Sequence, residues 1–182
     1  MPPDEEATPL LIDCATLAVT PVALPPDVEL VVFHSGQSRD LAALAYTRRV
    51  AECAAAEAEV GSLRTASVAD VDRLADPVVR RRARHVVTEN TRVVAAADAL
   101  ARGDGATVGR LMGESHASLR DDYEVSTPAV DKLVARLSAT HGVLGARLTG
   151  AGFGGASWRW SVPVATGRRG GSGPVASGMI QW

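Results

Sequence analysis

The sequence predicts an α+β fold. Short runs rich in Val, Ile, Leu and Thr occupy the first 33 residues, and amphipathic helical periodicities fill the middle of the chain. Another strand-like run and a glycine-rich segment follow near residue 150. Strands that are grouped apart from helices, instead of alternating with them, are typical of α+β proteins.

The N-terminal part of the chain predicts three strands, at residues 10–13, 18–23 and 28–33. The Pro-Pro-Asp sequence at 25–27 has the composition of a turn and separates the last two strands. Residues 30–33, with the sequence Leu-Val-Val-Phe, are continuously apolar. Such a run predicts a strand that is covered on both faces.

Two long helices are expected next. The first begins near Leu41 and ends near Gly61, and its second half is rich in alanine and glutamate. The second begins at Asp76 and Pro77, because a cap residue followed by proline is a common helix start, and it ends before Gly103. The predicted inward face of this second helix consists of Val79, Ala83, Val86, Asn90, Val93, Ala97 and Leu100.

Two shorter helices complete the helical region. One covers residues 106–118, although Gly109 and Gly113 each weaken it by about 1 kcal/mol relative to alanine. The other begins at Thr127, which is followed by proline, and it ends at Gly142.

A glycine-rich segment follows a predicted strand at residues 143–149. Gly150, Gly152 and Gly155 satisfy the GxGxxG pattern of dinucleotide-binding folds, which requires a helix directly afterwards and an acidic residue about 20 positions further on. Neither is present, because residues 156–162 alternate like a strand and no Asp or Glu follows Asp131. Two interpretations remain: a loop whose amides approach an anionic ligand, or a tight hairpin in which glycine supplies positive φ.

The composition indicates one ordinary soluble domain, or at most two small ones. The chain has 182 residues, 46% of them hydrophobic, with 19 basic and 21 acidic side chains. No run of 18 apolar residues occurs, and the first six residues are unlike a signal peptide, so we expect a cytoplasmic protein without a membrane partner. Cys14 and Cys53 are expected to be reduced and buried.

Four arginines, at positions 80, 81, 82 and 84, form a basic cluster near the start of the second long helix. A nucleic-acid site is one interpretation. The cluster lacks interleaved aromatic residues and lies in an acidic part of the chain, which favours a solvated face with local carboxylate partners. We therefore expect no nucleic-acid partner.

Residues 114–126 are unusually rich in polar side chains. His116, with Ser115, Ser118, Asp121 and Asp122 nearby in sequence, allows a hydrolase triad as one interpretation, but no strand–elbow–helix context surrounds either serine. We expect instead a polar network that fixes the approach of two helices, in which Arg120 binds carboxylates with both arms of its guanidinium. The three other histidines have no metal-ligand spacing and are expected to be structural or on the surface: His34, His85 and His141.

Two long segments, residues 111–126 and 142–155, resemble the C-terminal half of galactokinases, in the superfamily of small-molecule kinases that includes homoserine, mevalonate and phosphomevalonate kinases (the GHMP kinases). Three shorter matches occur in the same order, at residues 11–14, 45–49 and 82–90. The resemblance covers about residues 10–155.

The resemblance implies a ferredoxin-like GHMP-kinase C-terminal domain at residues 36–155. Residues 1–35 would then be the last strands of the N-terminal kinase domain. Residues 156–182, which are rich in Gly, Arg and Trp, depart from the family pattern, and we expect them to form a poorly ordered tail. The activity implied is the ATP- and Mg-dependent phosphorylation of galactose to galactose 1-phosphate.

The resemblance also implies a site. Tyr46 matches a sugar-binding position, and Arg120 and Asp121 match supporting positions. The family's third motif, a glycine loop between sugar and phosphates, corresponds to Thr149, Gly150, Gly152, Gly154 and Gly155. The family's ATP loop and catalytic aspartate have no match in these residues, so no catalytic residue is assigned and we expect a partial enzyme that works with a separate N-terminal kinase half.

Two other functions stay open at this stage. One is a non-catalytic regulator that binds a sugar or nucleotide, and the other is an inactive fragment. The sugar is open as well, because N-acetylgalactosamine kinases and other sugar kinases share this C-terminal pattern.

Overall fold

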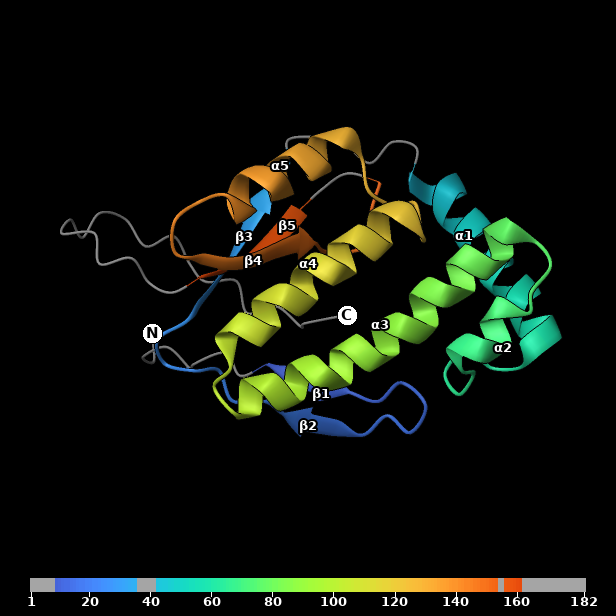
Figure 1. Cartoon of the computed structure of the whole chain (residues 1–182), viewed down its shortest axis with the longest axis horizontal. Coiled ribbons are helices and arrows are strands. Elements are labelled where there is room, and N and C mark those ends of the chain that lie inside the picture. The colour runs from blue at the N-terminus through green and yellow to red at the C-terminus, as the bar shows by residue number, and fades with distance from the viewer. Residues whose placement is uncertain (1–8, 36–41, 154–155, 162–182) are drawn as a thin grey trace.

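The computed structural model describes residues 9–35, 42–153 and 156–161, and in these ranges it has five helices and five strands (Figure 1). The predicted α+β class is confirmed. Strands β1 (Leu10–Ile12), β2 (Val19–Pro21) and β3 (Glu29–His34) come first, and β4 (Val143–Leu148) and β5 (Ala156–Ser161) come last. The tail beyond residue 161, and Gly154 and Gly155, lie outside the described residues.

The helices agree closely with the sequence-based expectations. They are α1 (Ala42–Val60), α3 (Pro77–Ala101), α4 (Gly105–Asp121) and α5 (Pro128–Ser138). Asp76 caps α3 by accepting hydrogen bonds from the backbone of Val78 and Val79, at 2.7 and 3.2 Å. The short helix α2 (Val68–Asp72) was missed, although the capping box that Ser67 and Asp70 form at its start is a recognisable signal.

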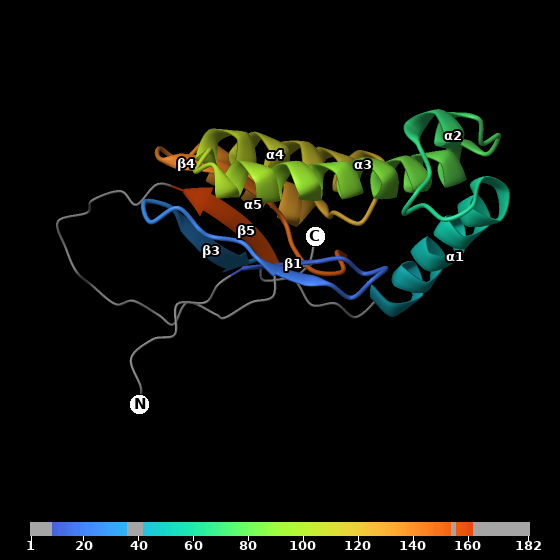
Figure 2. The same ribbon diagram turned by 90° about the horizontal axis from the view of Figure 1, so that it is seen from below.

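The larger sheet has the strand order β3-β5-β4, and all its pairs are antiparallel. Helices α4 and α5 pack on it, and α3 packs beside α4 (Figures 1 and 2). The apolar core between this sheet and α4 and α5 consists of Leu119, Val125, Val130, Val134, Leu137, Ala146 and Leu148. The smaller sheet is the β1–β2 hairpin.

Strand β3 differs from its prediction in one respect. Its side chains are exposed or half-buried, none is buried, and Val32 is 41% exposed, so the expectation of a strand covered on both faces is wrong. The reason is that the helices α4 and α5 pack on the sheet from one side (Figure 2). β3 is also an end strand, which pairs only with β5 among the described strands. By this pairing β3 belongs to the same sheet as β4.

The buried face of α3 is only partly the apolar stripe that was predicted. Ala83 and Leu100 are buried, whereas Asn90 is exposed. The residues that were missed are polar: Arg82, His85 and Glu89 are each 7% exposed or less. Because polar side chains are buried only with partners, this face of α3 must be matched by polar groups on the neighbouring elements.

Helix α4 approaches β4 unusually closely. A Cβ atom at Gly109 would lie 2.0 Å from the carbonyl oxygen of Leu144, and one at Gly145 would lie 2.3 Å from the carbonyl oxygen of Gly109. The two glycines therefore face each other across the contact, and neither position has room for a methyl group. Gly113, one turn further along α4, has no atom within 4 Å of such a Cβ.

None of the described helices is both long enough and apolar enough to span a membrane.

Candidate functional site

The glycine loop, residues 149–155, connects β4 to β5 and is described as far as residue 153. Gly150 and Gly152 have φ angles of +79° and +83°, which favour glycine. A Cβ at Gly152 would lie 2.6 Å from both the Cβ and the carbonyl oxygen of Val125. The backbone N–H of Phe153 donates to that same carbonyl oxygen at 2.7 Å. The loop is therefore seated against Val125.

Tyr46 lies on α1 and is 54% exposed. It interacts electrostatically with Tyr123, whose hydroxyl lies 3.8 Å from the Cys53 sulfur on the same helix. Burial, together with Cys53 and Tyr46, raises the pKa of the Tyr123 hydroxyl. The ring of Tyr123 stacks on His85 with 4.5 Å between centroids. Tyr123 thus ties the α1 face that carries Tyr46 to α3.

One segment connects the two parts of the predicted site. Residues 122–126 follow α4, and within them Tyr123 contacts α1 while Val125 holds the glycine loop. Tyr46 and Gly152 therefore both lie close to this segment, although 105 residues separate them in the sequence.

Arg120 and Asp121 lie at the end of α4 and are about half exposed. The Nε and Nη2 atoms of Arg120 donate to the two carboxylate oxygens of Asp121, each at 2.7 Å, which is the two-armed contact expected for Arg120. The pair interacts electrostatically with His116 and Asp131. These contacts place it beside the α4–α5 junction.

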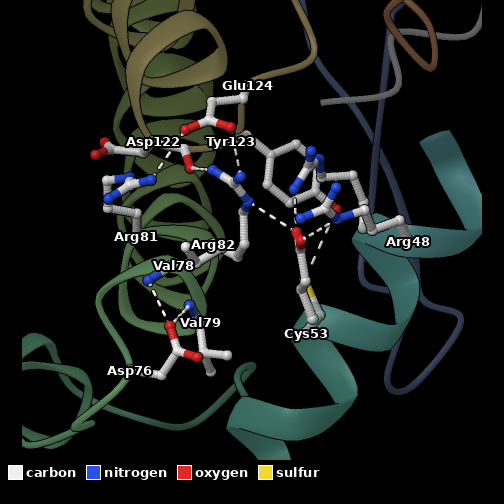
Figure 3. A network of polar contacts seen from close by, with 12 residues as sticks. Arg48, Cys53, Asp76, Val78, Val79, Arg81, Arg82, Asp122, Tyr123 and Glu124 are labelled. Atoms are coloured by element: carbon white, nitrogen blue, oxygen red, sulfur yellow. Dashed lines mark hydrogen bonds and ion pairs between the residues drawn. The ribbon is translucent and has the colours of Figure 1, made fainter.

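The arginine cluster at the start of α3 is neutralised by carboxylates, but it is not a uniformly solvated face. Arg82 is 2% exposed, which contradicts that expectation for this residue. It donates to Glu52 of α1 at 2.9 Å, to the carbonyl oxygen of Asp122 at 2.5 Å and to Glu124 at 2.6 Å. Figure 3 shows Arg82 with Asp122 and Glu124. Arg81 binds the other oxygen of Glu124 at 3.0 Å. The hydrogen bond from Arg82, supported by that from Arg81, lowers the pKa of Glu124 to about 2, although burial opposes this shift.

A second buried network surrounds Glu89 on α3. Its carboxylate accepts hydrogen bonds from Ser115 at 2.5 Å, Arg92 at 2.7 Å and Arg147 of β4 at 3.0 Å. Burial alone would raise the pKa of Glu89, but Arg147, Ser115 and Arg92 together lower it. The sequence analysis did not foresee the roles of Glu89 and Arg147 in this network. Their only signal in the sequence is one arginine inside the otherwise apolar run of β4.

The hydrolase triad is ruled out as an interpretation of residues 114–126. The hydroxyl of Ser115 faces Glu89, and that of Ser118 lies 3.0 Å from Nδ1 of His85 and donates to Asp122 at 2.8 Å. Neither serine is a partner of His116. The expected polar network between helices is confirmed for Ser115 and Ser118, which join α4 to Glu89 and His85 of α3. Arg120 binds the adjacent Asp121 and is not part of this network.

The cysteines do not form a reactive site. Cys14 is exposed, so its predicted burial is wrong, and Cys53 is half-buried. Burial raises the pKa of the Cys53 thiol, which keeps it protonated and unreactive at neutral pH.

Comparison with known proteins decides the family. Residues 96–157 match the family model described as GHMP kinases C terminal. These residues are a GHMP kinase C-terminal domain. The chain is also 50% identical over 157 residues to the galactokinase of Roseiflexus sp. (strain RS-1), which covers 80% of this chain and 40% of that protein.

Solved structures agree with this assignment. The crystal structure of Lactococcus lactis galactokinase complexed with galactose has a TM-score of 0.78 and 36% identity, covering 84% of this chain and 42% of that one. That of L. major mevalonate kinase in complex with R-mevalonate has a TM-score of 0.55 and 22% identity, over 79% of this chain and 36% of that one, and shows the fold alone. The chain thus spans about two fifths of the length of the galactokinases it matches.

The GHMP kinase C-terminal domain contains the glycine loop, α4 and α5, whereas Tyr46 lies before it in sequence. ATP and Mg²⁺ are the cofactors that the resemblance implies. The positive φ angles of Gly150 and Gly152 fit a loop whose backbone amides can face an anion such as phosphate. Among the described residues there is no group of three or more His, Cys, Asp or Glu that could hold a metal ion.

The buried His85 next to this domain predicts acid sensitivity. Burial lowers the pKa of His85 from 6.5 to about 4, with Glu89 opposing the shift. In the unfolded chain His85 is protonated below about pH 6.5, whereas in the folded chain it stays neutral down to about pH 4. The free energy of unfolding therefore falls as the pH is lowered through this window. We expect the free energy of unfolding to drop by about 2 kcal/mol between pH 7 and 4.5 through this group, measured by urea denaturation.

The control for this prediction is His85→Phe, which keeps a ring against Tyr123 but cannot titrate. The variant should lose the share of the pH dependence that comes from His85, whereas the share that comes from the buried His116 and from carboxyl groups with lowered pKa values should remain. Equal slopes in the two proteins would contradict the assignment to His85.

Proposed function

We propose that this chain is the C-terminal part of a galactokinase-like enzyme that phosphorylates galactose to galactose 1-phosphate. In the proposed reaction the anomeric hydroxyl of the sugar loses its proton and forms a bond to the γ-phosphorus of ATP, and ADP leaves. ATP supplies the phosphoryl group, and Mg²⁺ neutralises charge on its phosphates. The observation that carries the proposal is the seating of the glycine loop on Val125, in the same segment whose Tyr123 faces the helix of Tyr46.

Each residue has a role in this proposal. Tyr46 contacts the sugar with its exposed phenol. The glycine loop lies between the sugar and the phosphates, and the residues proposed to form it are Thr149, Gly150, Gly152, Gly154 and Gly155. Arg120 and Asp121 support the α4 end beside it. The nucleotide loop and the base that takes the proton are proposed to come from an N-terminal kinase half, carried by another polypeptide or by the same one.

Both cysteines of the chain are unpaired, as is usual in a reducing compartment, and we place the reaction in the cytoplasm.

The test uses two arms. The chain is incubated with galactose, ATP and Mg²⁺, first alone and then with the purified N-terminal half of the Roseiflexus galactokinase, and galactose 1-phosphate is followed by phosphorus NMR. We expect product only in the second arm. Product in neither arm, with galactose or ATP binding still detected by calorimetry, would replace the proposal with a regulatory role. N-acetylgalactosamine, offered at the same concentration, tests the choice of sugar.

Tyr46 has a matched control on its own helix. Tyr46→Ala is expected to raise KM for galactose about tenfold in the reconstituted enzyme, as the loss of one hydrogen-bonding and stacking contact would. Leu44→Ala, at a position that is 80% exposed, should leave KM unchanged. An equal KM in both variants would remove Tyr46 from the sugar site.

A further inference from the structure

The last residue of β4 is held in an unusual way. Leu148 is completely buried, and β4 is an end strand of its sheet, so the outward backbone groups of Leu148 have no neighbouring strand among the described ones. Side chains take the place of a strand. The N–H of Leu148 donates to Nδ1 of His116 at 3.3 Å, and its carbonyl oxygen accepts from Nε of Arg147 at 2.9 Å. We name His116 and Arg147 the Leu148 clamp.

Both members of the clamp are held from behind by buried groups. Arg147 donates to Glu89, which Ser115 and Arg92 also bind. These contacts fix the guanidinium of Arg147 in the orientation in which its Nε donates to the carbonyl oxygen of Leu148.

His116 is held by α5. Its Nε2 lies 3.3 Å from a carboxylate oxygen of Asp131 without being aligned as a hydrogen-bond donor, so the two groups interact electrostatically. The same oxygen accepts a hydrogen bond from Ser126 at 2.5 Å. Since Nδ1 accepts the Leu148 N–H, the imidazole must be neutral with its proton on Nε2.

The clamp lies directly before the glycine loop. Thr149 and Gly150 follow Leu148, and the loop is next fixed at Gly152 and Phe153, which contact Val125. The described part of the loop, residues 149–153, is therefore held at both of its ends, and the first of these attachments depends on side chains, not on sheet pairing. A shift of Leu148 along the edge of β4 would move the loop amides with it.

We propose that His116 and Arg147 are positioning residues that fix the backbone of Leu148 and thereby set the position of the glycine loop. This inference rests on the proposed function for its catalytic meaning, because it is phosphate binding that requires the loop amides to be preorganised. The physical claim, that the clamp orders the loop, stands or falls independently of turnover.

The clamp should open in acid. Protonation of Nδ1 removes the acceptor of the Leu148 N–H. The charged groups facing His116 are Asp131 on α5, Arg120 and Asp121 on α4, and Arg147 on β4. Burial lowers the pKa of His116 below its ordinary value of 6.5, against the opposing effect of Asp131, so the clamp is closed at neutral pH and opens as the pH falls below this value.

The experiment is amide hydrogen exchange of the full chain, read at residues 148–153 and, as a reference for global unfolding, at α3. His116→Leu removes the acceptor, and His116→Asn keeps an acceptor at the position of Nδ1. Loss of one buried hydrogen bond predicts exchange about tenfold faster at residues 148–153 in His116→Leu, beyond any change at α3. His116→Asn should exchange like the unchanged protein and should lose the acid-induced increase.

Two further variants separate positioning from general stability. Ser118→Ala removes a buried hydrogen bond of α4 to His85 that does not touch β4, so exchange at the loop should rise only in parallel with α3. Arg147→Lys keeps the charge beside Glu89 but loses the Nε donor to Leu148, and the loop should again exchange faster than α3.

Three results would overturn the clamp: loop exchange in His116→Leu that rises only as much as at α3, no rescue by His116→Asn, or an unchanged loop in Arg147→Lys.

The proposed function is tested separately, by adding ATP with Mg²⁺ and galactose, together with the N-terminal half of the Roseiflexus galactokinase, to the unchanged chain. Slower exchange at residues 149–153 supports phosphate binding there. Unchanged exchange, with the variant results as expected, removes the function but keeps the clamp.

Discussion

Replacing Gly109 by alanine is expected to destabilise the protein by about 3 kcal/mol or more, although alanine is the better helix former. The added methyl group would lie 2.0 Å from the carbonyl oxygen of Leu144 and 2.4 Å from its carbonyl carbon. Both atoms belong to the backbone of β4, so no side-chain rotation can relieve the contact and the helix must move off the sheet. Overpacking of this kind usually costs 1–3 kcal/mol, and this contact is at the severe end. Urea denaturation measures the loss.

Gly113→Ala is the matched control for this prediction. It makes the same change on the same helix, where no atom lies within 4 Å of the new methyl group. There the helix propensity alone should act and should stabilise the protein by up to about 1 kcal/mol. If both variants changed the free energy of unfolding in the same direction, the close contact between α4 and β4 would not exist as described.

Replacing Arg82 by methionine is the other change with a large expected effect. The Arg82 side chain is 2% exposed, and its guanidinium donates hydrogen bonds to Glu52, to Glu124 and to the backbone carbonyl of Asp122. Removing one partner of a buried ion pair typically costs 3–5 kcal/mol. We expect a loss of about 3 kcal/mol, at the low end, because Arg48 and Arg49 also pair with Glu52.

The control for Arg82 lies two residues along the helix. Arg84 pairs with Asp72, but both side chains are more than 40% exposed, so Arg84→Met should cost less than about 1 kcal/mol. Equal effects of the two arginine substitutions would mean that burial of Arg82 contributes nothing.

The positions of the helices could be predicted because their signals are local. Asp76 with Pro77, and Thr127 with Pro128, act through hydrogen bonds and backbone angles within one helical turn, and both begin helices in the structure. The strand at 156–161 was visible as an alternating pattern, but the expectation that a poorly ordered tail begins at residue 156 is wrong for these six residues, which form the central strand of the sheet. The α+β class followed from the order of these elements.

The buried polar faces could not be predicted in this way. A search for apolar periodicity assigns Arg82 and Glu89 to the surface, and their burial depends on Glu52 and Arg147, which lie 30 and 58 residues away. Gly109 shows the same limit. The sequence indicates only the cost of a glycine to the helix, whereas the contact with β4 that requires it is a tertiary one.

The candidate site was predicted through resemblance and not from residue chemistry. Tyr46 and Gly152 carry no pattern that relates them, and the structure relates them through Tyr123 and Val125. The side chains of His116 and Arg147 at the start of the loop became visible only when the free edge of β4 was known.

The strand order β3-β5-β4 has a consequence for how the protein is made. The central strand, β5, is the last of the three to leave the ribosome. Its partner β3 is synthesised more than 100 residues earlier. Helical pairs such as α3 with α4 can form during synthesis, but closing the sheet is a late, long-range step of the kind that slows folding. Until then β3 has two unpaired edges, and a nascent chain halted before residue 156 is expected to need a chaperone to keep them apart from other chains.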